Sequence, residues 1–118
     1  MRVLLVSTYE LGRQPFGLAS PAACLRADGH DVTCADLAVE RLSLDAIRQA
    51  DLIAFHLPMH TATRLAAPVI EAARRVNASA HLCCYGLYAP VNAEYLRSLG
   101  VETLLGGEFE NELRRLAL

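Results

Sequence analysis

The segment of this sequence with the most potential chemistry holds two histidines four residues apart, His56 and His60. An imidazole can ligate a metal, carry a proton or hydrogen-bond a ligand. Because no carboxylate lies close to either residue in the sequence, the pair predicts hydrogen-bonding groups rather than metal ligands. Thr61 and Thr63 follow directly, and either hydroxyl is also a candidate for the N-cap of a helix.

Three further segments combine small residues with aromatic or polar side chains. They are 7–17, 85–90 and 106–110. The first is long for a connection between a strand and a helix, and such loops are usually functional. Gly86 and the pair Gly106-Gly107 would let a ligand approach the backbone closely. The glycine pair is also compatible with a simple turn into a last helix.

The composition excludes several chemistries. All eleven basic residues are arginine, so the chain has no lysine for a phosphate-binding loop, a Schiff base or a nucleophile. The four cysteines lack C-x-x-C spacing, which predicts free buried thiols rather than a zinc or iron–sulfur site. No Ser-His-Asp, Cys-His or paired-carboxylate arrangement is legible, so we predict no catalytic residue and no metal ligand.

The charge and hydropathy of the chain also narrow its partners. The formal net charge of −2 gives no reason to expect nucleic acid or an anionic membrane. No apolar stretch approaches the roughly 18 residues of a membrane span, and the first apolar run is too short for a signal peptide. We therefore expect a soluble, cytoplasmic protein.

Five β-rich runs alternate with helical patterns along the sequence. The runs are Arg2–Ser7, Asp31–Asp36, Asp51–His56, Ala80–Tyr85 and Val101–Leu105. The first, third and fourth are nearly continuously apolar, which is typical of strands covered on both faces.

Helices are predicted between these runs. The first ends near Gly29, and a short second one begins at Ser43. A fourth is predicted from Val91 to Leu99, and Phe109 marks the last. The longest helix is predicted to bury one stripe of residues, namely Leu65, Val69, Ala72, Ala73 and Val76.

This alternation predicts a single α/β domain over residues 1–118 with right-handed crossovers. We predict a Rossmann-like, flavodoxin-like three-layer sandwich whose five-stranded parallel sheet has the order 2-1-3-4-5. Ligands of such sheets bind beyond the carboxyl ends of the strands, where the segments after Ser7, His56, Tyr85 and Leu105 would meet. Their small and apolar residues predict a large, partly apolar ligand.

Several motifs in these segments occur together in one known family. They are Ser7-Thr8-Tyr9-Glu10 with Gly17, Gly29-His30-Asp31-Val32, Asp51-Leu52-Ile53, Pro58-Met59-His60-Thr61 and Gly106-Gly107-Glu108-Phe109-Glu110. Over essentially its whole length the chain resembles the N-terminal cobalamin-binding domain of B12-dependent radical SAM proteins. The Gly-His-Asp-Val motif is common, whereas its combination with the Gly-Gly-Glu motif is more specific.

The chain departs from other cobalamin-binding domains at one central position. Domains of the methionine-synthase and mutase type carry Asp-x-His-x-x-Gly after the first strand, and that histidine is the lower cobalt ligand. Here Gly17 matches the glycine, Gln14 stands in place of the histidine and Gly12 in place of the aspartate. The resemblance therefore implies base-off cobalamin without a histidine ligand. By position, it also places His56 against the benzimidazole tail, where the mutase type has a Ser-x-Leu motif.

The function implied by the resemblance is a cobalamin-binding module of a radical SAM enzyme. The nucleotide tail would enter between sheet and helices, and the corrin ring would lie over the loops. Methyl transfer or radical chemistry would belong to a catalytic domain with S-adenosylmethionine and a 4Fe-4S cluster, because no Cys-x-x-x-Cys-x-x-Cys motif occurs here. The chain is therefore interpreted as part of a longer enzyme. The expected cobalamin contacts are Ser7, Thr8, Tyr9, Gly12, Gln14, Gly17, His56, Leu57, Met59, His60, Thr61, Gly86, Leu87, Tyr88, Gly106, Gly107 and Glu108.

Two other functions remain open from the sequence. The domain could be a ligand-free scaffold whose loops dock a partner domain. It could also bind a nucleotide, a nucleotide sugar or a flavin, as other proteins of this topology do.

Overall fold

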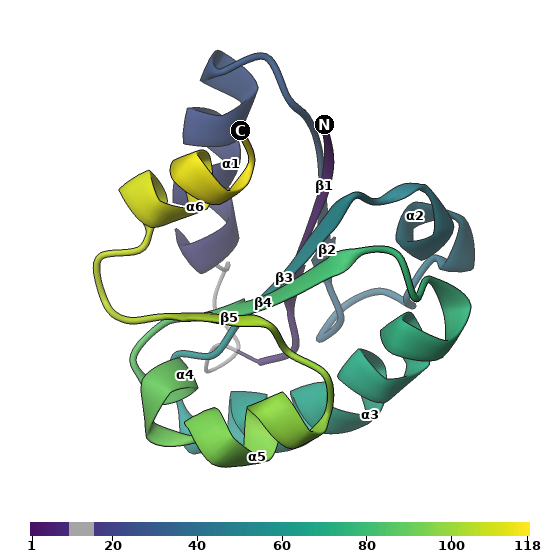
Figure 1. Ribbon diagram of the computed structural model, residues 1–118, viewed down its shortest axis with the longest axis vertical. Helices are drawn as coiled ribbons and strands as arrows, with labels where there is room; N and C mark the ends of the chain where they lie inside the picture. Colours follow the sequence, from purple (N-terminus) through teal and green to yellow (C-terminus); the bar gives the residue numbers. More distant parts are fainter. Residues whose placement is uncertain (10–15) are drawn as a thin grey trace.

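The structure is a computed structural model that describes residues 1–9 and 16–118, without the side chain of Phe16. Its centre is a five-stranded, all-parallel sheet with the order β2-β1-β3-β4-β5 (Figure 1). The strands are β1 (Arg2–Ser7), β2 (Asp31–Asp36), β3 (Leu52–His56), β4 (His81–Tyr85) and β5 (Thr103–Leu105). The predicted fold and strand order are confirmed.

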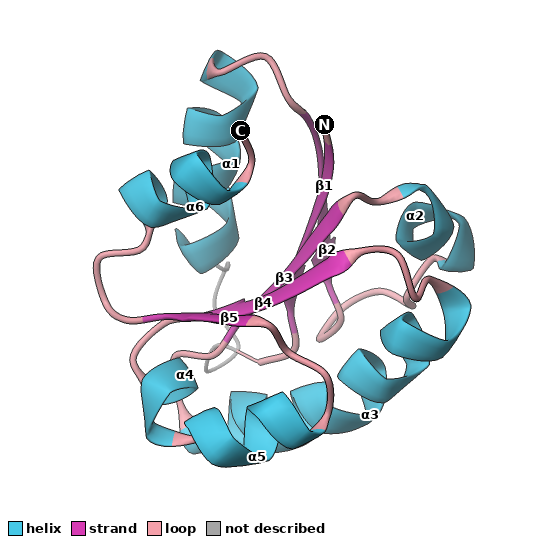
Figure 2. Ribbon diagram, in the orientation of Figure 1, coloured by secondary structure: helices cyan, strands magenta, loops and turns pink. Residues whose placement is uncertain are grey.

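Helices cover both faces of the sheet and complete the three layers (Figure 2). One face carries α1 (Phe16–Ala27) and α6 (Glu110–Leu116). The other carries α2 (Leu44–Gln49), α3 (His60–Val76), α4 (Tyr88–Val91) and α5 (Ala93–Ser98). Among the described residues no helix is long and apolar enough to cross a membrane.

The sheet separates two hydrophobic cores because neighbouring residues of a strand point to opposite faces. In β1, Leu4 and Val6 pack with α2 and α3, whereas Val3 and Leu5 pack with α1 and α6. Both faces of β1 and β3 are buried, which explains why these two segments are continuously apolar.

The register of the strands brings the predicted ligand-binding segments together. Ser7 pairs with His56, His56 with Tyr85, and Tyr85 with Leu105. The last residues of four neighbouring strands therefore lie side by side at the carboxyl edge of the sheet. Side chains at register positions share a face, so those of Ser7, His56 and Tyr85 lie on the side of α1 and α6.

Local signals set the ends of several helices as predicted. Gly29, with φ of +89°, follows α1, and the backbone N–H of Gly29 donates to Arg26 O at 3.0 Å. The Ser43 hydroxyl caps α2 by accepting from Ala46 N at 3.2 Å.

The helix predicted over Val91–Leu99 is present as α5, and a separate short helix, α4, precedes it. The Asn92 side chain between the two helices donates to Tyr88 O at 2.9 Å. Of the stripe predicted for α3, Ala73 is buried and Val69 and Val76 pack against the core, whereas Leu65 is 44% exposed. The residues that α3 buries are Ala62, Thr63, Ala66, Ala67, Ile70 and Ala73.

Candidate functional site

A hollow of about 400 Å³ opens at the carboxyl edge of the sheet, between α1, α6 and the segments that follow β3, β4 and β5. This volume falls within the range of small-molecule sites. Its lining consists of three glycines, two aromatic rings, two apolar residues and a polar pair: Gly17, Gly86, Gly107, His56, Phe109, Pro58, Leu87, Ser20 and Glu110.

Three rings form a cluster beneath this hollow. The His56 ring lies 5.1 Å from the Tyr85 ring and 5.8 Å from the Phe109 ring, and the Tyr85 and Phe109 rings are 4.6 Å apart, all between centroids. Burial lowers the pKa of His56 to about 4, so its imidazole is neutral at pH 7. The rings occupy the space between the sheet and the two helices, and His56 and Phe109 present an uncharged aromatic floor to the hollow.

Two glycines make room for the His56 ring. A Cβ atom at Gly17, in the first turn of α1, would overlap the Cε1 and Nδ1 atoms of His56. On another side of the ring, a Cβ at Gly86 would lie 3.2 Å from His56 Cδ2 and 2.8 Å from Leu57 O. Gly86 also has φ of +114°, a conformation that other residues rarely adopt. The position of His56 therefore requires glycine at residue 17, and the backbone requires it at residue 86.

The carbonyl of Gly17 is held from outside its own helix. Its regular helical donor would be the N–H of residue 21, but that residue is Pro21, which has no N–H and whose ring crowds this carbonyl. The Tyr85 hydroxyl supplies the missing donor, at 2.6 Å from Gly17 O, in a buried position. This bond ties the first turn of α1 to the end of β4 and fixes one wall of the hollow.

Replacing Tyr85 by phenylalanine is expected to lower the free energy of unfolding by about 2 kcal/mol, because a buried carbonyl loses its donor. In a Pro21→Ala background the new N–H of residue 21 can reach the same carbonyl, so the cost of Tyr85→Phe should fall by about 1 kcal/mol. Urea unfolding of the four variants measures both values. An equal cost in both backgrounds would show that the hydroxyl does not replace the helical donor.

A buried hydroxyl lies beside the ring cluster. Ser7 is 1% exposed and is the register partner of His56. Its Oγ atom hydrogen-bonds to none of the described residues. Ser7, which was predicted as a contact, is not among the residues that line the hollow.

Gly107, the third glycine that lines the hollow, is not required by a close contact as the other two glycines are. A Cβ there would meet Leu87 Cδ2 at an ordinary 3.5 Å, and the φ angle is not in the left-handed region. Nothing among the described residues requires glycine at this position. Its missing side chain keeps the hollow wide, as expected where a ligand lies against backbone.

The structure brings five of the predicted site residues together around the hollow: Gly17, His56, Gly86, Leu87 and Gly107. Gly12 and Gln14 lie outside the described residues. Thr8 and Leu57 have structural positions instead. The Thr8 hydroxyl donates to Ala62 O at 2.8 Å, and the Leu57 side chain is fully buried in the core on the other face.

The remaining predicted residues do not line the hollow. They are Tyr9, Met59, His60, Thr61, Tyr88, Gly106 and Glu108. Met59 is the N-cap residue of α3, so neither Thr61 nor Thr63 is the N-cap. A Cβ at Gly106 would lie 3.9 Å from Pro90 Cγ rather than in the hollow.

Four lining residues were not predicted as contacts: Ser20, Pro58, Phe109 and Glu110. Helical periodicity could have found Ser20, which lies one turn after Gly17. Phe109 and Glu110 belong to the Gly-Gly-Glu-Phe-Glu segment, but only its first three residues were assigned to the site. The two residues bring an aromatic ring and a carboxylate to the hollow.

Within the described residues no group of three His, Cys, Asp or Glu side chains could hold a metal ion. The thiols of Cys83 and Cys84 are buried in β4, and burial raises the pKa of Cys83 to about 12. These thiols are therefore protonated and suited to packing rather than to reaction.

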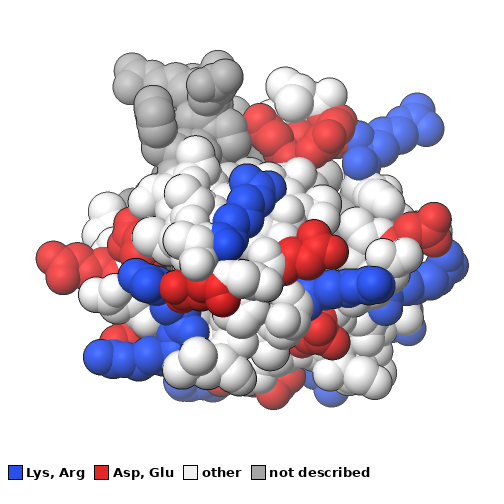
Figure 3. All heavy atoms as spheres, turned by 90° about the horizontal axis from the view of Figure 1, so that it is seen from above, with Lys and Arg blue, Asp and Glu red and all other residues white. Residues whose placement is uncertain are grey.

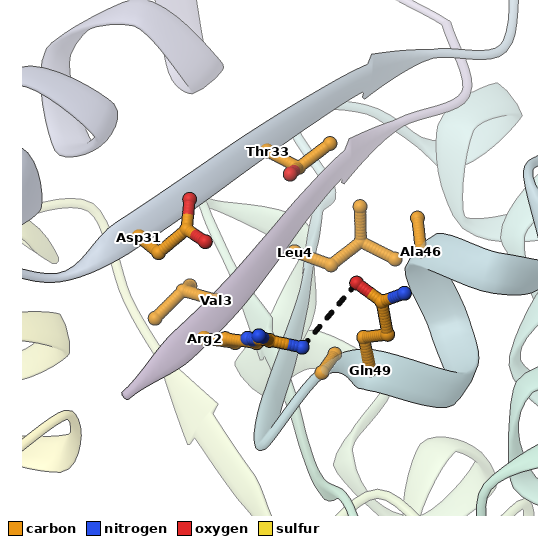
Figure 4. Close-up of a pocket in the computed structure, with 8 residues that line it drawn as sticks. Arg2, Val3, Leu4, Asp31, Thr33, Ala46 and Gln49 are labelled. Carbon is orange, nitrogen blue, oxygen red and sulfur yellow. Dashed lines mark hydrogen bonds between the residues drawn. The ribbon is translucent and has the colours of Figure 1, made fainter.

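The opposite edge of the sheet holds a much smaller hollow, of about 40 Å³ (Figure 4). Arg2, Asp31, Thr33 and Gln49 line it, and Arg2 Nη1 donates to Gln49 Oε1 at 3.4 Å. Its volume suits an ordered water rather than a cofactor.

The described charges on the face shown in Figure 3 have mixed signs. Arg114 forms a two-pronged pair with Asp28, at 2.7 and 2.8 Å, and Arg115 pairs with Glu112 at 2.6 Å. The Arg114 guanidinium lowers the pKa of Asp28 through this hydrogen bond. Among the described residues, the face in Figure 3 shows no basic stripe of the kind that follows a nucleic-acid backbone.

Comparison with known proteins supports the fold. No protein-family model matches the sequence, and no curated protein matches it significantly. The structure is similar to a CheY-like response regulator receiver domain from Methanospirillum hungatei JF-1, with a TM-score of 0.73 and 18% identity over 98% of this chain and 90% of that one. It is also similar to a flavodoxin from the domain Archaea, with a TM-score of 0.65 and 15% identity over 98% of this chain and 93% of that one. At these identities the likeness shows a shared fold.

Proposed function

We propose that this domain binds cobalamin at the carboxyl edge of its sheet. The observation that carries the proposal is the glycine-walled hollow above the rings of His56 and Phe109, with Gly107 keeping open a space that the fold itself does not require. The resemblance of the sequence to cobalamin-binding domains of radical SAM proteins supports the same conclusion.

The lining fits a planar heteroaromatic group such as the benzimidazole of the cobalamin tail. Neutral His56 and Phe109 offer ring faces and edges for stacking, and Leu87 adds apolar contact. Because the three rings fill the space between sheet and helices, the tail would rest on His56 and Phe109.

The rest of the cofactor would lie over the loops at this edge. Because Gly86 and Gly107 have no side chains, a large ring system can approach the backbone closely at these two positions. Bound cobalamin would supply a cobalt centre that can carry a methyl group or start radical chemistry together with a radical SAM catalytic domain. The role of this chain would be to bind and orient the cofactor.

Incubation with hydroxocobalamin, gel filtration and a visible spectrum test this function. The wild-type chain should retain the corrin absorption, whereas Gly107→Val should weaken retention by at least about tenfold, because its side chain enters the hollow. Gly106→Val is the matched control, since it changes the neighbouring backbone position on the side of Pro90. A colourless wild-type chain, with oxidised or reduced cofactor, would overturn the proposal.

A docking domain without a ligand is the second candidate function. Leu87, which precedes α4, is 69% exposed, and Val91 of α4 and Tyr95 of α5 are 76% and 50% exposed. These residues offer an apolar surface next to the hollow. A flavin is the alternative ligand of this topology, and its own absorption would reveal it in the purified protein. The spectrum described above separates the three functions.

A further inference from the structure

Glu110 is the one charged side chain among the described residues that line the hollow. It lies at the start of α6, and the Ser20 hydroxyl of α1 donates to its Oε1 at 3.3 Å. This pair bridges the two helices at the rim. The only other ionisable group of the described lining, His56, is neutral at pH 7 and so cannot balance the negative charge.

The geometry points to Glu110 as the residue that selects ligands by charge at this rim. We infer that it favours a ligand that presents uncharged N–H donors, such as a carboxamide, over one that presents a carboxylate or a phosphate. This inference rests on the proposed function. It specifies that the part of the ligand next to α1 and α6 carries uncharged hydrogen-bond donors.

The physical reason is that the carboxylate of Glu110 is partly buried and that no other described residue of the lining balances its charge. Glu110 has one oxygen engaged by Ser20, so it can still accept hydrogen bonds from an amide. A second negative charge placed nearby would be repelled, and the effective dielectric constant near a protein surface makes this repulsion stronger than in bulk water. Glu110 is therefore expected to lower the affinity for an acidic analogue relative to the affinity for the uncharged ligand.

The test compares two ligands that differ by one charge: hydroxocobalamin and a monocarboxylic acid derivative with one peripheral amide hydrolysed. The wild-type chain should bind the amide form roughly fivefold to tenfold more tightly. Glu110→Gln keeps the shape of the side chain and should remove most of this preference. Raising the salt concentration should reduce the preference of the wild type as well, because the rim is open to solvent.

Glu112→Gln is the matched control. Glu112 is on the same helix, but its carboxylate accepts from Arg115 Nη1 at 2.6 Å and does not line the hollow. This variant should keep the wild-type preference. An equal affinity of the wild type for both ligands, or a preference that Glu110→Gln leaves unchanged, would overturn the role of Glu110 while cobalamin binding stands.

Failure of the proposed function gives a different result, because neither cobalamin would then be retained. Riboflavin and flavin mononucleotide form a second pair that differs in one phosphate. A preference for riboflavin that Glu110→Gln removes would support charge selection by Glu110 at a flavin site. Retention of no cobalamin and no flavin would overturn both proposals.

Discussion

Replacing Gly17 by alanine is expected to lower the free energy of unfolding by about 2 kcal/mol. The same change inside a helix normally stabilises a protein by about 0.5–1 kcal/mol, so the sign is reversed. The reason is that the new methyl group would overlap the His56 ring. That ring has little room to move, because it packs against Tyr85 and Phe109 and lies close to Gly86.

A double-mutant cycle with His56→Ala identifies the cause of this loss. Once the ring is removed, Gly17→Ala should cost little or become stabilising, which gives a coupling energy of at least about 1 kcal/mol. Ala23→Gly, on an exposed part of the same helix, measures the ordinary backbone contribution. Additive effects of the two substitutions would mean that the glycine does not serve to accommodate His56.

Acidification should weaken the fold through His56. Its pKa is about 4 in the folded chain and about 6.5 when unfolded, so between these values the unfolded chain binds more protons than the folded one. The stability contributed by neutral His56 is thus complete above about pH 6.5 and falls as the pH approaches 4. Over this window the loss is about 3 kcal/mol, a large part of the stability of a small domain.

Unfolding by urea across this pH range, for the wild type and for His56→Gln, measures the contribution. The variant should lose much less stability between about pH 7 and pH 4 than the wild type. Carboxylates such as Asp28 titrate in both proteins, so their effect cancels in the difference. His60→Gln, at an exposed histidine, should behave as the wild type does. Parallel pH profiles for the wild type and His56→Gln would contradict the depressed pKa of His56.

The fold could be predicted from the sequence because its central strands have a strong signal. Burial on both faces makes β1 and β3 continuously apolar, and Gly29 and Ser43 mark helix ends by local chemistry. The face of α3 could not be predicted in the same way. The buried residues of α3 are mostly alanines, because small side chains allow the helix to pack close to the sheet. Alanine is only weakly hydrophobic, so these residues do not mark the buried face in the sequence. The larger Leu65, which would suggest a buried face, is 44% exposed.

The candidate site was predicted at the level of its edge, its glycines and His56, but the rest of its floor was not. His56, Tyr85 and Phe109 belong to different strands and loops, and only tertiary packing brings their rings together. Glu110 was missed for a related reason, because α6 alone does not show which side of the helix meets Ser20. The sequence places Ser20 and Glu110 near this edge of the sheet. Their contact with each other depends on how α1 packs against α6, which the sequence pattern does not show.

One steric contact and one hydrogen bond meet at Gly17, and together they limit which substitutions this sequence can accept during evolution. Gly17 is glycine because of His56, and its carbonyl depends on Tyr85 because residue 21 is proline. A lineage that changes one member of either pair first passes through a less stable protein. Among homologues, residues 17 and 56 should therefore covary, as should residues 21 and 85, and the hollow above them should be kept or lost as a unit.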